Sequence, residues 1–357
     1  THLSEEIKNK IEKIRQEGAK LDAVLTSMFE GIMVVDEKGR ILVMNPSIRK
    51  LFFIDTTPEG KQPAEVIRNS VVVDIVERLL RGKQRFVSEE VVLNAPEEKT
   101  FKVNASAILR AQSLDGAVLV FHDITELRRL EKVRREFVAN VSHELRTPIS
   151  SIKGYAETLL GGAMDDKDCL KEFLGIIQQN SDRLANLIND LLDLAKIESG
   201  KMDMVFVPLD IRPIIARCLA ILEKQAVAKV LVIKVDAPDI LPKVLGDEAR
   251  LSQVFLNLLD NAVKYTPERG SVKVSVIVGE KSLRVDVADT GLGIPEEDLP
   301  RIFERFYRVD KARSRDLGGT GLGLSIVKHI VYAHRGEVWA KSTLGLGTTF
   351  SFTIPLA

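Results

Sequence analysis

Residues Phe137–Pro148 read Phe-Val-Ala-Asn-Val-Ser-His-Glu-Leu-Arg-Thr-Pro, and the predicted domains lie on either side of this stretch. Apolar residues recur around it at steps of three and four, the spacing of one helix face. These residues are Leu127, Leu130, Phe137, Val141, Leu145, Ile149, Ile152 and Leu159. His143 therefore lies in a long amphipathic helix predicted over residues 126–161. Pro148 falls inside this helix and lacks a backbone donor, so we expect a bend just after the histidine.

His143 has three interpretations. A lone helical histidine is commonly a hydrogen-bonded structural residue. A zinc-binding helix would need a second histidine four residues later, where this chain has Thr147, so a zinc site is not favoured. The third interpretation makes His143 a nucleophile that carries a phosphoryl group. Glu144 follows it directly, and Thr147 lies one helical turn away on the same face.

The segment Ser142–Pro148 resembles the phospho-acceptor motif of bacterial sensor histidine kinases. Asn-rich and Gly-rich segments further along resemble the same family in the right order. The resemblance is specific over residues 126–357 and weaker over the first 125, and it favours the nucleophile. It implies that His143 is phosphorylated from ATP and that the phosphoryl group then passes to an aspartate of a response regulator.

The resemblance also implies roles for the two neighbours of His143. Glu144 would act as general base on the imidazole, although adjacent helical residues diverge, so this role needs the bend at Pro148 or a favourable rotamer. Thr147 would orient a water that attacks the aspartyl phosphate of the regulator, since a hydroxyl both donates and accepts hydrogen bonds. The alternative is that Thr147 stabilises the turn before Pro148.

Composition limits the function classes. At 357 residues the chain is too long for one ordinary domain. Its 51 basic and 51 acidic side chains balance, which gives no support to a nucleic-acid binder. Two cysteines, Cys169 and Cys218, fall in separate predicted elements and form neither a disulfide framework nor a metal pattern. A reducing, cytoplasmic compartment is the simplest inference.

Membrane segments are not predicted within these residues. No apolar run approaches the length of about 18 residues that a spanning helix needs, and no signal peptide is present. We therefore expect no membrane contact within this stretch. The chain begins with Thr1 instead of methionine, which suggests a piece of a longer protein. Sensor kinases of this kind commonly carry membrane helices upstream, so we expect an anchor before residue 1.

The first 125 residues are predicted to form a connector and a sensor. Residues 1–30 hold a helix with near-heptad apolar spacing, which favours a coiled-coil-like connector over a helix on the surface of the next domain. Residues 31–125 hold five short strands around a helical region and resemble a PAS sensor domain. Glu37-Lys38-Gly39 is the predicted turn between the first two strands.

The composition of residues 31–125 limits what such a sensor binds. The region has no cysteine, which a flavin photosensor needs. Its only histidine, His122, lies in the last strand and not in the helical region where a haem sensor of this fold places its axial ligand. A rigid connector without ligand and an unidentified small ligand remain open alternatives.

Residues 126–198 are predicted to form an antiparallel helical hairpin. Gly161-Gly162 ends the first helix, and Asp165 and Asp166 suit the start of the second. The apolar stripe of the second helix comprises Phe173, Ile177, Leu184, Leu187, Leu191 and Leu194. Two such helices cannot bury their stripes alone, so we expect a homodimer that forms a four-helix bundle. Asn180, within the stripe, is expected to set the register.

Residues 199–208 are the predicted linker, and residues 209–357 form an α+β layer with helices on one face of a sheet. Asn257, Asn261, Lys264 and Tyr265 belong to a predicted helix, and the first three share one face. Side-chain carbonyl oxygens suit Mg²⁺, and a lysine one turn away can reach phosphates. A solvated polar face is the alternative.

Three further segments resemble the ATP-binding boxes of the family, which has a GHKL-type α/β-sandwich. Asp289, at a strand end before two glycines, would accept the adenine amino group, and Arg308 would reach the γ-phosphate. A glycine-rich turn opening a helix would present backbone N–H groups to phosphates. Residues 309–318 are a predicted mobile lid. The implied nucleotide ligands are Asn257, Asn261, Lys264, Tyr265, Asp289, Gly291, Gly293, Arg308, Gly319, Thr320, Gly321, Leu322 and Gly323, with Asn261 on the Mg²⁺.

Two other function classes fit parts of the chain. An ATPase clamp of the gyrase, chaperone or mismatch-repair type shares the nucleotide boxes but lacks the Ser-His-Glu-Leu-Arg-Thr-Pro helix. A non-catalytic dimer scaffold would bind nucleotide only for signalling. Every residue expected in the kinase site is present, so the sequence favours a multidomain α+β histidine kinase that uses ATP and Mg²⁺.

Overall fold

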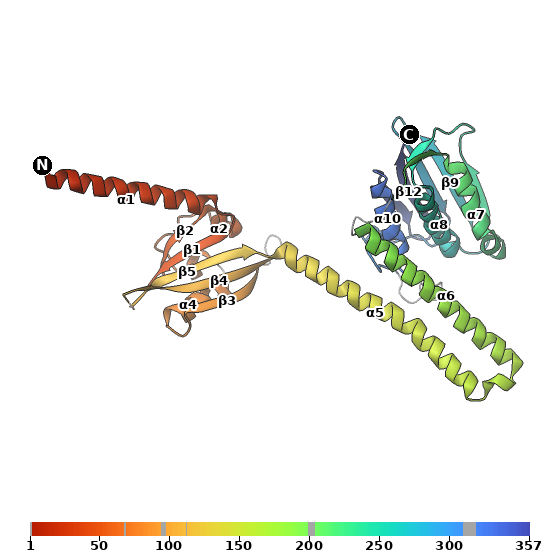
Figure 1. Cartoon of the computed structure of the whole chain (residues 1–357), viewed down its shortest axis with the longest axis horizontal. Helices are drawn as coiled ribbons and strands as arrows, with labels where there is room; N and C mark the ends of the chain where they lie inside the picture. Colours follow the sequence, from red (N-terminus) through yellow and green to blue (C-terminus); the bar gives the residue numbers. More distant parts are fainter. Residues whose placement is uncertain (1, 68, 94–97, 112, 199–203, 310–318) are drawn as a thin grey trace. The chain divides into compact units, whose positions relative to one another are not determined.

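The computed structural model describes residues 2–67, 69–93, 98–111, 113–198, 204–309 and 319–357 (Figure 1). Its contacts divide the chain into two compact units, Thr1–Arg135 and Glu136–Ala357. The predicted lid, except for Val309, and the first half of the predicted linker lie outside the described residues. No helix among the described residues combines the length and the apolar character needed to cross a membrane.

The first unit contains an antiparallel sheet of order β2-β1-β5-β4-β3 (Figure 1). Its elements are α1 (His2–Ser27), β1 (Gly31–Asp36), β2 (Ile41–Met44), α2 (Pro46–Leu51), α3 (Pro63–Val66), α4 (Ser70–Leu80), β3 (Phe86–Leu93), β4 (Lys99–Arg110) and β5 (Ser113–Asp123). The five predicted strands are confirmed, with ends that differ by a few residues. Gly39 has a φ of +77° in the predicted turn, a conformation that glycine adopts without strain.

The core of this unit lies between the sheet and α4. Alternate strand residues such as Val103 and Leu119 are fully buried, as are Ile75 and Leu79 of α4. Alternation in the strands gives the sheet one apolar face, and the helical spacing in α4 gives this helix one apolar face. The two faces pack against each other. The side of the sheet that faces α4 is therefore occupied by packed apolar side chains.

Buried Asn45 joins the end of α1 to the sheet. Its Nδ2 donates to the carbonyls of Leu25 at 3.1 Å and Glu30 at 2.8 Å. Its Oδ1 accepts from the N–H groups of Ile32 at 2.9 Å and Ile48 at 3.2 Å. Both polar atoms of the Asn45 amide have hydrogen-bond partners, so its burial leaves no unsatisfied group. Asn45 therefore holds the segment that follows α1 against the sheet.

The hairpin consists of α5 (Thr125–Leu160) and α6 (Lys167–Glu198), with a short 3₁₀ turn, Ala163–Asp165, between them. The helix α5 continues through buried Pro148, so the proline does not end it. Gly162, with a φ of +123°, follows the end of α5 as predicted. Oδ1 of Asp166 accepts the N–H groups of Cys169 and Asp168, and these bonds lower the pKa of Asp166.

The C-terminal part of the second unit is built on a sheet of order β11-β12-β10-β9-β7, in which only the β7–β9 pair is parallel. The elements are β6 (Val207–Leu209), α7 (Ile211–Ala228), β7 (Val232–Asp236), β8 (Val244–Gly246), α8 (Glu248–Tyr265), β9 (Ser271–Val278), β10 (Ser282–Asp289), α10 (Gly323–Ala333), β11 (Val338–Thr343) and β12 (Gly347–Pro355). Val274 and Val285 of neighbouring strands lie in one core with Phe255 of α8 and Ile326 of α10. The predicted α+β layer is thus confirmed.

The end of the predicted linker belongs to this fold. Val207 and Pro208 lie in β6, which pairs with β8, and the N–H of Val205 donates to Asp247 at 2.9 Å. The prediction that residues 199–208 form a linker ending at Pro208 is therefore wrong for Val207 and Pro208. Proline is tolerated here because β6 is a short strand in a two-stranded sheet.

The C-terminal half of α6 packs on the α+β layer. Leu187 and Leu194 are 2% and 1% exposed, and both belong to the same hydrophobic core as α7, α8 and α10. These residues are members of the stripe that we predicted to be buried by a second copy of the chain. Within one chain, the stripe is therefore already covered at this end of the hairpin.

Candidate active site

The helix α8 carries the predicted magnesium and phosphate ligands. Asp247 caps its first turn by accepting the N–H of Arg250, and Asn257, Asn261 and Lys264 are half-buried along it. Nδ2 of Asn257 donates to the carbonyl of Gly323 at 3.4 Å, which brings the predicted Asn-rich and Gly-rich segments together. Lys264 pairs with Asp260 at 2.5 Å, one turn back on the same helix.

The C-terminal end of α8 is held by a side chain from another helix. Nζ of Lys229, the C-cap residue of α7, donates to the carbonyls of Val263 at 2.9 Å, Lys264 at 2.8 Å and Thr266 at 3.1 Å. The last carbonyls of a helix lack intrahelical donors and carry partial negative charge. A cation in this position therefore satisfies them and fixes the turn that carries Lys264 and Tyr265.

Asp289, the predicted adenine ligand, is the last residue of β10. Its Oδ1 accepts the N–H of Gly291 at 2.8 Å and that of Thr348 at 3.3 Å. Burial raises the pKa of Asp289, and the two backbone hydrogen bonds oppose this rise. A Cβ on Gly291 would lie 2.7 Å from the carbonyl oxygen of Tyr265, so only glycine fits between this loop and α8.

The glycine-rich turn leads into α10. Gly321 has a φ of +73°, and a Cβ there would lie 2.9 Å from the Cα of Phe306. The N–H of Phe306 donates to the carbonyl of Gly321 at 2.8 Å, which joins the turn to the segment before Arg308. Gly323 opens α10, so the free N–H groups of a helix N-terminus lie next to Asn257.

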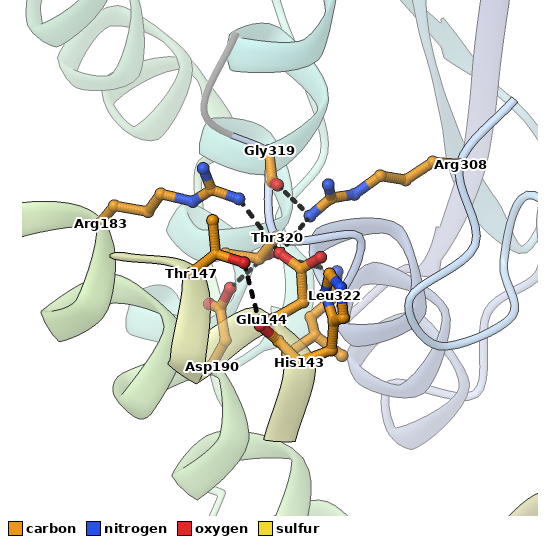
Figure 2. A network of polar contacts seen from close by, with 9 residues as sticks. All are labelled: His143, Glu144, Thr147, Arg183, Asp190, Arg308, Gly319, Thr320 and Leu322. Carbon is orange, nitrogen blue, oxygen red and sulfur yellow. Dashed lines mark hydrogen bonds and ion pairs between the residues drawn. The ribbon is translucent and has the colours of Figure 1, made fainter. Parts of the chain in front are cut away.

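Glu144 lies between two arginines (Figure 2). Its Oε2 accepts from Nη2 of Arg183, on α6, and from Nη2 of Arg308, each at 3.0 Å. The side chains of Glu144, Arg183 and Arg308 are 14%, 17% and 7% exposed, so water screens these ion pairs poorly. Arg308 also donates to the carbonyl of Gly319 in the glycine-rich turn. One carboxylate thus links the helical turn of His143 to both α6 and the nucleotide segments.

His143 itself is exposed on α5, next to this cluster (Figure 2). Among the contacts of the described residues, none joins the carboxylate of Glu144 to the imidazole of His143. Oγ1 of Thr147 donates to the carbonyl of His143 at 3.2 Å. This bond is the one expected if Thr147 stabilises the turn before Pro148, while the hydroxyl oxygen remains an acceptor.

A second polar contact joins α6 to the glycine-rich turn. Oγ1 of Thr320 donates to Oδ2 of Asp190 at 2.9 Å, and Thr320 also accepts the N–H of Leu322 at 3.2 Å. Burial raises the pKa of Asp190, and the bond from Thr320 opposes this rise. Asp193, further along α6, pairs with Arg250 of α8 at 3.0 Å.

Aromatic packing supports the same arrangement. The rings of Phe137, on α5, and Phe306 lie 5.8 Å apart, and the guanidinium of Arg305 lies 5.6 Å from the Phe137 ring. Such tilted ring pairs and cation–π contacts are favourable beyond their buried area. Phe306, two residues before Arg308, therefore packs on the histidine helix.

Sequence reasoning did not identify Arg183, Asp190 or Asp193. Each lies on α6 directly before or between residues of the apolar stripe, where a charged residue is usually solvated. Their partners are distant in sequence: Glu144 lies 39 residues from Arg183, Thr320 lies 130 residues from Asp190, and Arg250 lies 57 residues from Asp193. No local spacing predicts such contacts.

Three family models match the chain in the order of these elements. The PAS fold matches residues 25–129, and the His Kinase A (phospho-acceptor) domain matches residues 133–200. The model of the histidine kinase-, DNA gyrase B- and HSP90-like ATPase matches residues 246–357.

Curated relatives and a solved structure agree with these matches. Sensor histidine kinase WalK of Bacillus subtilis strain 168 is 36% identical over 357 residues, which is 99% of this chain and 58% of the relative. A sensor protein kinase WalK of Staphylococcus aureus is 34% identical over 99% of this chain and 85% of the relative. The chain therefore spans little more than half of most of the relatives compared, such as the Bacillus protein. Histidine kinase ThkA, solved in complex with the response regulator protein TrrA, is similar in fold, with a TM-score of 0.52, 24% identity, and coverage of 92% and 96% of the two chains.

Proposed function

This chain belongs to the bacterial two-component sensor histidine kinase family, and we propose that it phosphorylates its own His143 from ATP and passes the phosphoryl group to an aspartate of a response regulator. The observation that carries the proposal is the Glu144–Arg308–Gly319 contact, which joins the turn of His143 to the glycine-rich turn. A phosphoryl donor bound at that turn lies within reach of the histidine helix without unfolding of either part.

We propose that ATP binds between α8, the Asp289 loop and the glycine-rich turn. Asp289 would accept the adenine amino group, and the N–H groups of residues 319–323 would contact phosphates. Asn261 fits a Mg²⁺ ligand because its amide is half-buried on the same face as Lys264, and a neutral oxygen ligand suits an ion that phosphates already neutralise. When bound, Mg²⁺ would offset the negative charge that develops on the phosphates.

The transfer step follows from these positions. One ring nitrogen of His143 forms a bond to the γ-phosphorus while the bond from that phosphorus to the β–γ bridging oxygen breaks, and ADP leaves with the electron pair. The other ring nitrogen loses its proton to a base, for which Glu144 is the candidate. Lys264 and Arg308 offset charge on the transferred group. For Arg308 this requires release from Glu144.

We also propose a domain layout: a connector at residues 1–30, a PAS-like sensor at 31–125, the dimerisation and phosphotransfer hairpin at 126–198, a linker at 199–206 and the ATP-binding domain at 207–357. The order of the three matched family models supports this layout, and the strand β6 extends the last domain back to Val207. A membrane anchor upstream of residue 1 completes the proposal.

A labelling experiment tests the proposed function. The protein is incubated with γ-labelled ATP and Mg²⁺, and the bound label is tested for stability in acid and in base. A phosphohistidine loses its phosphate in acid and keeps it in base, whereas phosphoserine does the opposite. Free labelled phosphate with no protein-bound label would indicate an ATPase, and label on neither product would indicate a scaffold.

Dimerisation through the hairpin is the first specific prediction. Ile149 on α5 and Leu174 on α6 are 50% and 51% exposed within one chain, which leaves apolar surface for a second copy. We expect light scattering to give a dimer at micromolar concentration and the Ile149→Glu/Leu174→Glu variant to give a monomer. Ile240→Glu, at an exposed apolar residue outside the hairpin, is the control. An active wild-type monomer would contradict the prediction.

The next prediction separates the two interpretations of Thr147. If Thr147 orients a water for attack on the regulator's aspartyl phosphate, Thr147→Ala keeps autophosphorylation and loses most dephosphorylation of the regulator, about tenfold or more. Both activities are measured on one preparation, with ADP present in the phosphatase assay. Thr158→Ala is the matched control, because Thr158 also donates to a carbonyl four residues back, that of Gly154. A parallel fall of both activities would make Thr147 structural.

A further inference from the structure

Under the proposed function, on which this inference rests, Arg308 has two anionic partners, the carboxylate of Glu144 and the γ-phosphate of ATP. In the structure Nη2 of Arg308 contacts both Oε2 of Glu144 and the carbonyl of Gly319. During phosphoryl transfer the same guanidinium must contact the γ-phosphate. The two N–H groups of Nη2 are taken by Glu144 and Gly319, and a carboxylate and a phosphate on one guanidinium repel each other. A γ-phosphate therefore competes with Glu144 for Arg308, and nucleotide binding draws Arg308 away from Glu144.

If Glu144 had Arg308 as its one counter-ion, the departure of Arg308 would leave a poorly exposed carboxylate unpaired. Breaking one side of such a pair costs much more than the pair contributes, because the remaining charge is desolvated. Glu144 has a second partner, however. Arg183 contacts the same oxygen at the same 3.0 Å distance, and it lies on α6, within the hairpin that also carries Glu144. This pair stays together when Arg308 leaves.

The geometry points to Arg183 as a positioning residue that holds Glu144 on the hairpin while the nucleotide takes Arg308. Two guanidinium groups on one oxygen also repel each other, so the presence of Arg183 weakens the hold of Glu144 on Arg308. Arg183 therefore favours release of Arg308 in two ways: it neutralises the carboxylate left behind and it competes for the oxygen beforehand.

The effect is a coupling between a hairpin residue and the γ-phosphate. Without Arg183, Glu144 keeps Arg308 more firmly, and a nucleotide with a γ-phosphate binds more weakly. Without the carboxylate of Glu144, Arg308 is free, and the same nucleotide binds more tightly. Without both, the effect of Arg183 disappears, because its action passes through Glu144. A nucleotide that lacks the γ-phosphate does not need Arg308 and is insensitive to all three changes.

The test measures nucleotide affinity by calorimetry on the full chain with Mg²⁺, using the non-hydrolysable β,γ-imido analogue of ATP and, as matched ligand, ADP. We expect Arg183→Gln to weaken binding of the imido analogue about five- to tenfold and Glu144→Gln to tighten it by a similar factor, in the usual range of coupling between sites. The double variant should match Glu144→Gln. Arg183→Lys, which keeps the charge, should restore most of the affinity, and ADP affinities should stay within about twofold.

Two results would overturn the role of Arg183: an unchanged ratio of imido-analogue to ADP affinity in Arg183→Gln, or a loss that persists in the Glu144→Gln background. Either would make Arg183 a structural residue of the hairpin. Thermal melting of each variant, with Arg183→Lys as the conservative change, separates these results from misfolding. A wild-type chain that binds neither nucleotide would instead overturn the proposed function itself, so the two failures are distinguishable.

Discussion

We expect the His143→Ala variant to take up no acid-labile phosphate from γ-labelled ATP, a loss of at least about a thousandfold, as is usual when a nucleophile is removed. His143 is exposed on α5, and alanine favours the helix more than histidine does, so the variant should keep its fold. Nucleotide affinity should remain close to that of the wild type, since the segments that we propose to bind nucleotide lie on α8, the Asp289 loop and the glycine-rich turn.

A matched control is available in His122, which is also exposed and lies in β5. His122→Ala should label like the wild type, which excludes a general effect of losing an imidazole. Acid-labile phosphate that persists in His143→Ala would assign the phospho-acceptor role to another histidine of the chain. Loss of both labelling and nucleotide binding would indicate damage to the fold.

Replacing Asn261 with aspartate should reduce autophosphorylation about a hundredfold or more, the range seen when one electrostatic contributor to a transition state is lost. The aspartate adds a negative charge where we propose that a neutral amide oxygen meets Mg²⁺ and the triphosphate. The half-buried position on α8 should tolerate the change, because the two side chains have nearly the same shape. Calorimetry should show weaker nucleotide binding whose dependence on Mg²⁺ concentration differs from that of the wild type.

The control adds the same charge elsewhere. Gln225 is exposed on α7, and Gln225→Glu should leave both labelling and the Mg²⁺ dependence unchanged. If Asn261→Asp has wild-type activity at physiological Mg²⁺ concentration, Asn261 is a solvated polar residue and the proposed ligand is wrong.

Elements with a strong local signal were predictable from the sequence. The near-heptad spacing in residues 1–30 placed α1, and the three-to-four spacing around His143 placed α5. Glycines at the end of α5 and Asp166 before α6 marked helix ends through their backbone preferences and capping groups. The segments that we propose to bind nucleotide could be selected for the same reason, because their residues are close in sequence and fall on one turn or one helix face.

Contacts between distant elements were not predictable in this way. The linker prediction failed at Val207 because a three-residue strand has too few residues to show a period, and its partner β8 is equally short. The apolar spacing shows that the stripe containing Leu187 must be covered. It does not show whether the α+β layer or a second copy of the chain covers it. The pairing of Glu144 with Arg183 and Arg308 depends on the same docking.

The ammonium group of Lys229 couples the C-terminal end of α7 to the C-terminal end of α8. It donates to three carbonyls at the end of α8, so a displacement of α7 against α8 acts on three hydrogen bonds at once. A displacement of α7 is therefore transmitted to the turn that carries Lys264 and Tyr265. A helix that contributes no proposed nucleotide ligand thus holds the end of α8 in two ways, through the shared apolar core and through one cation.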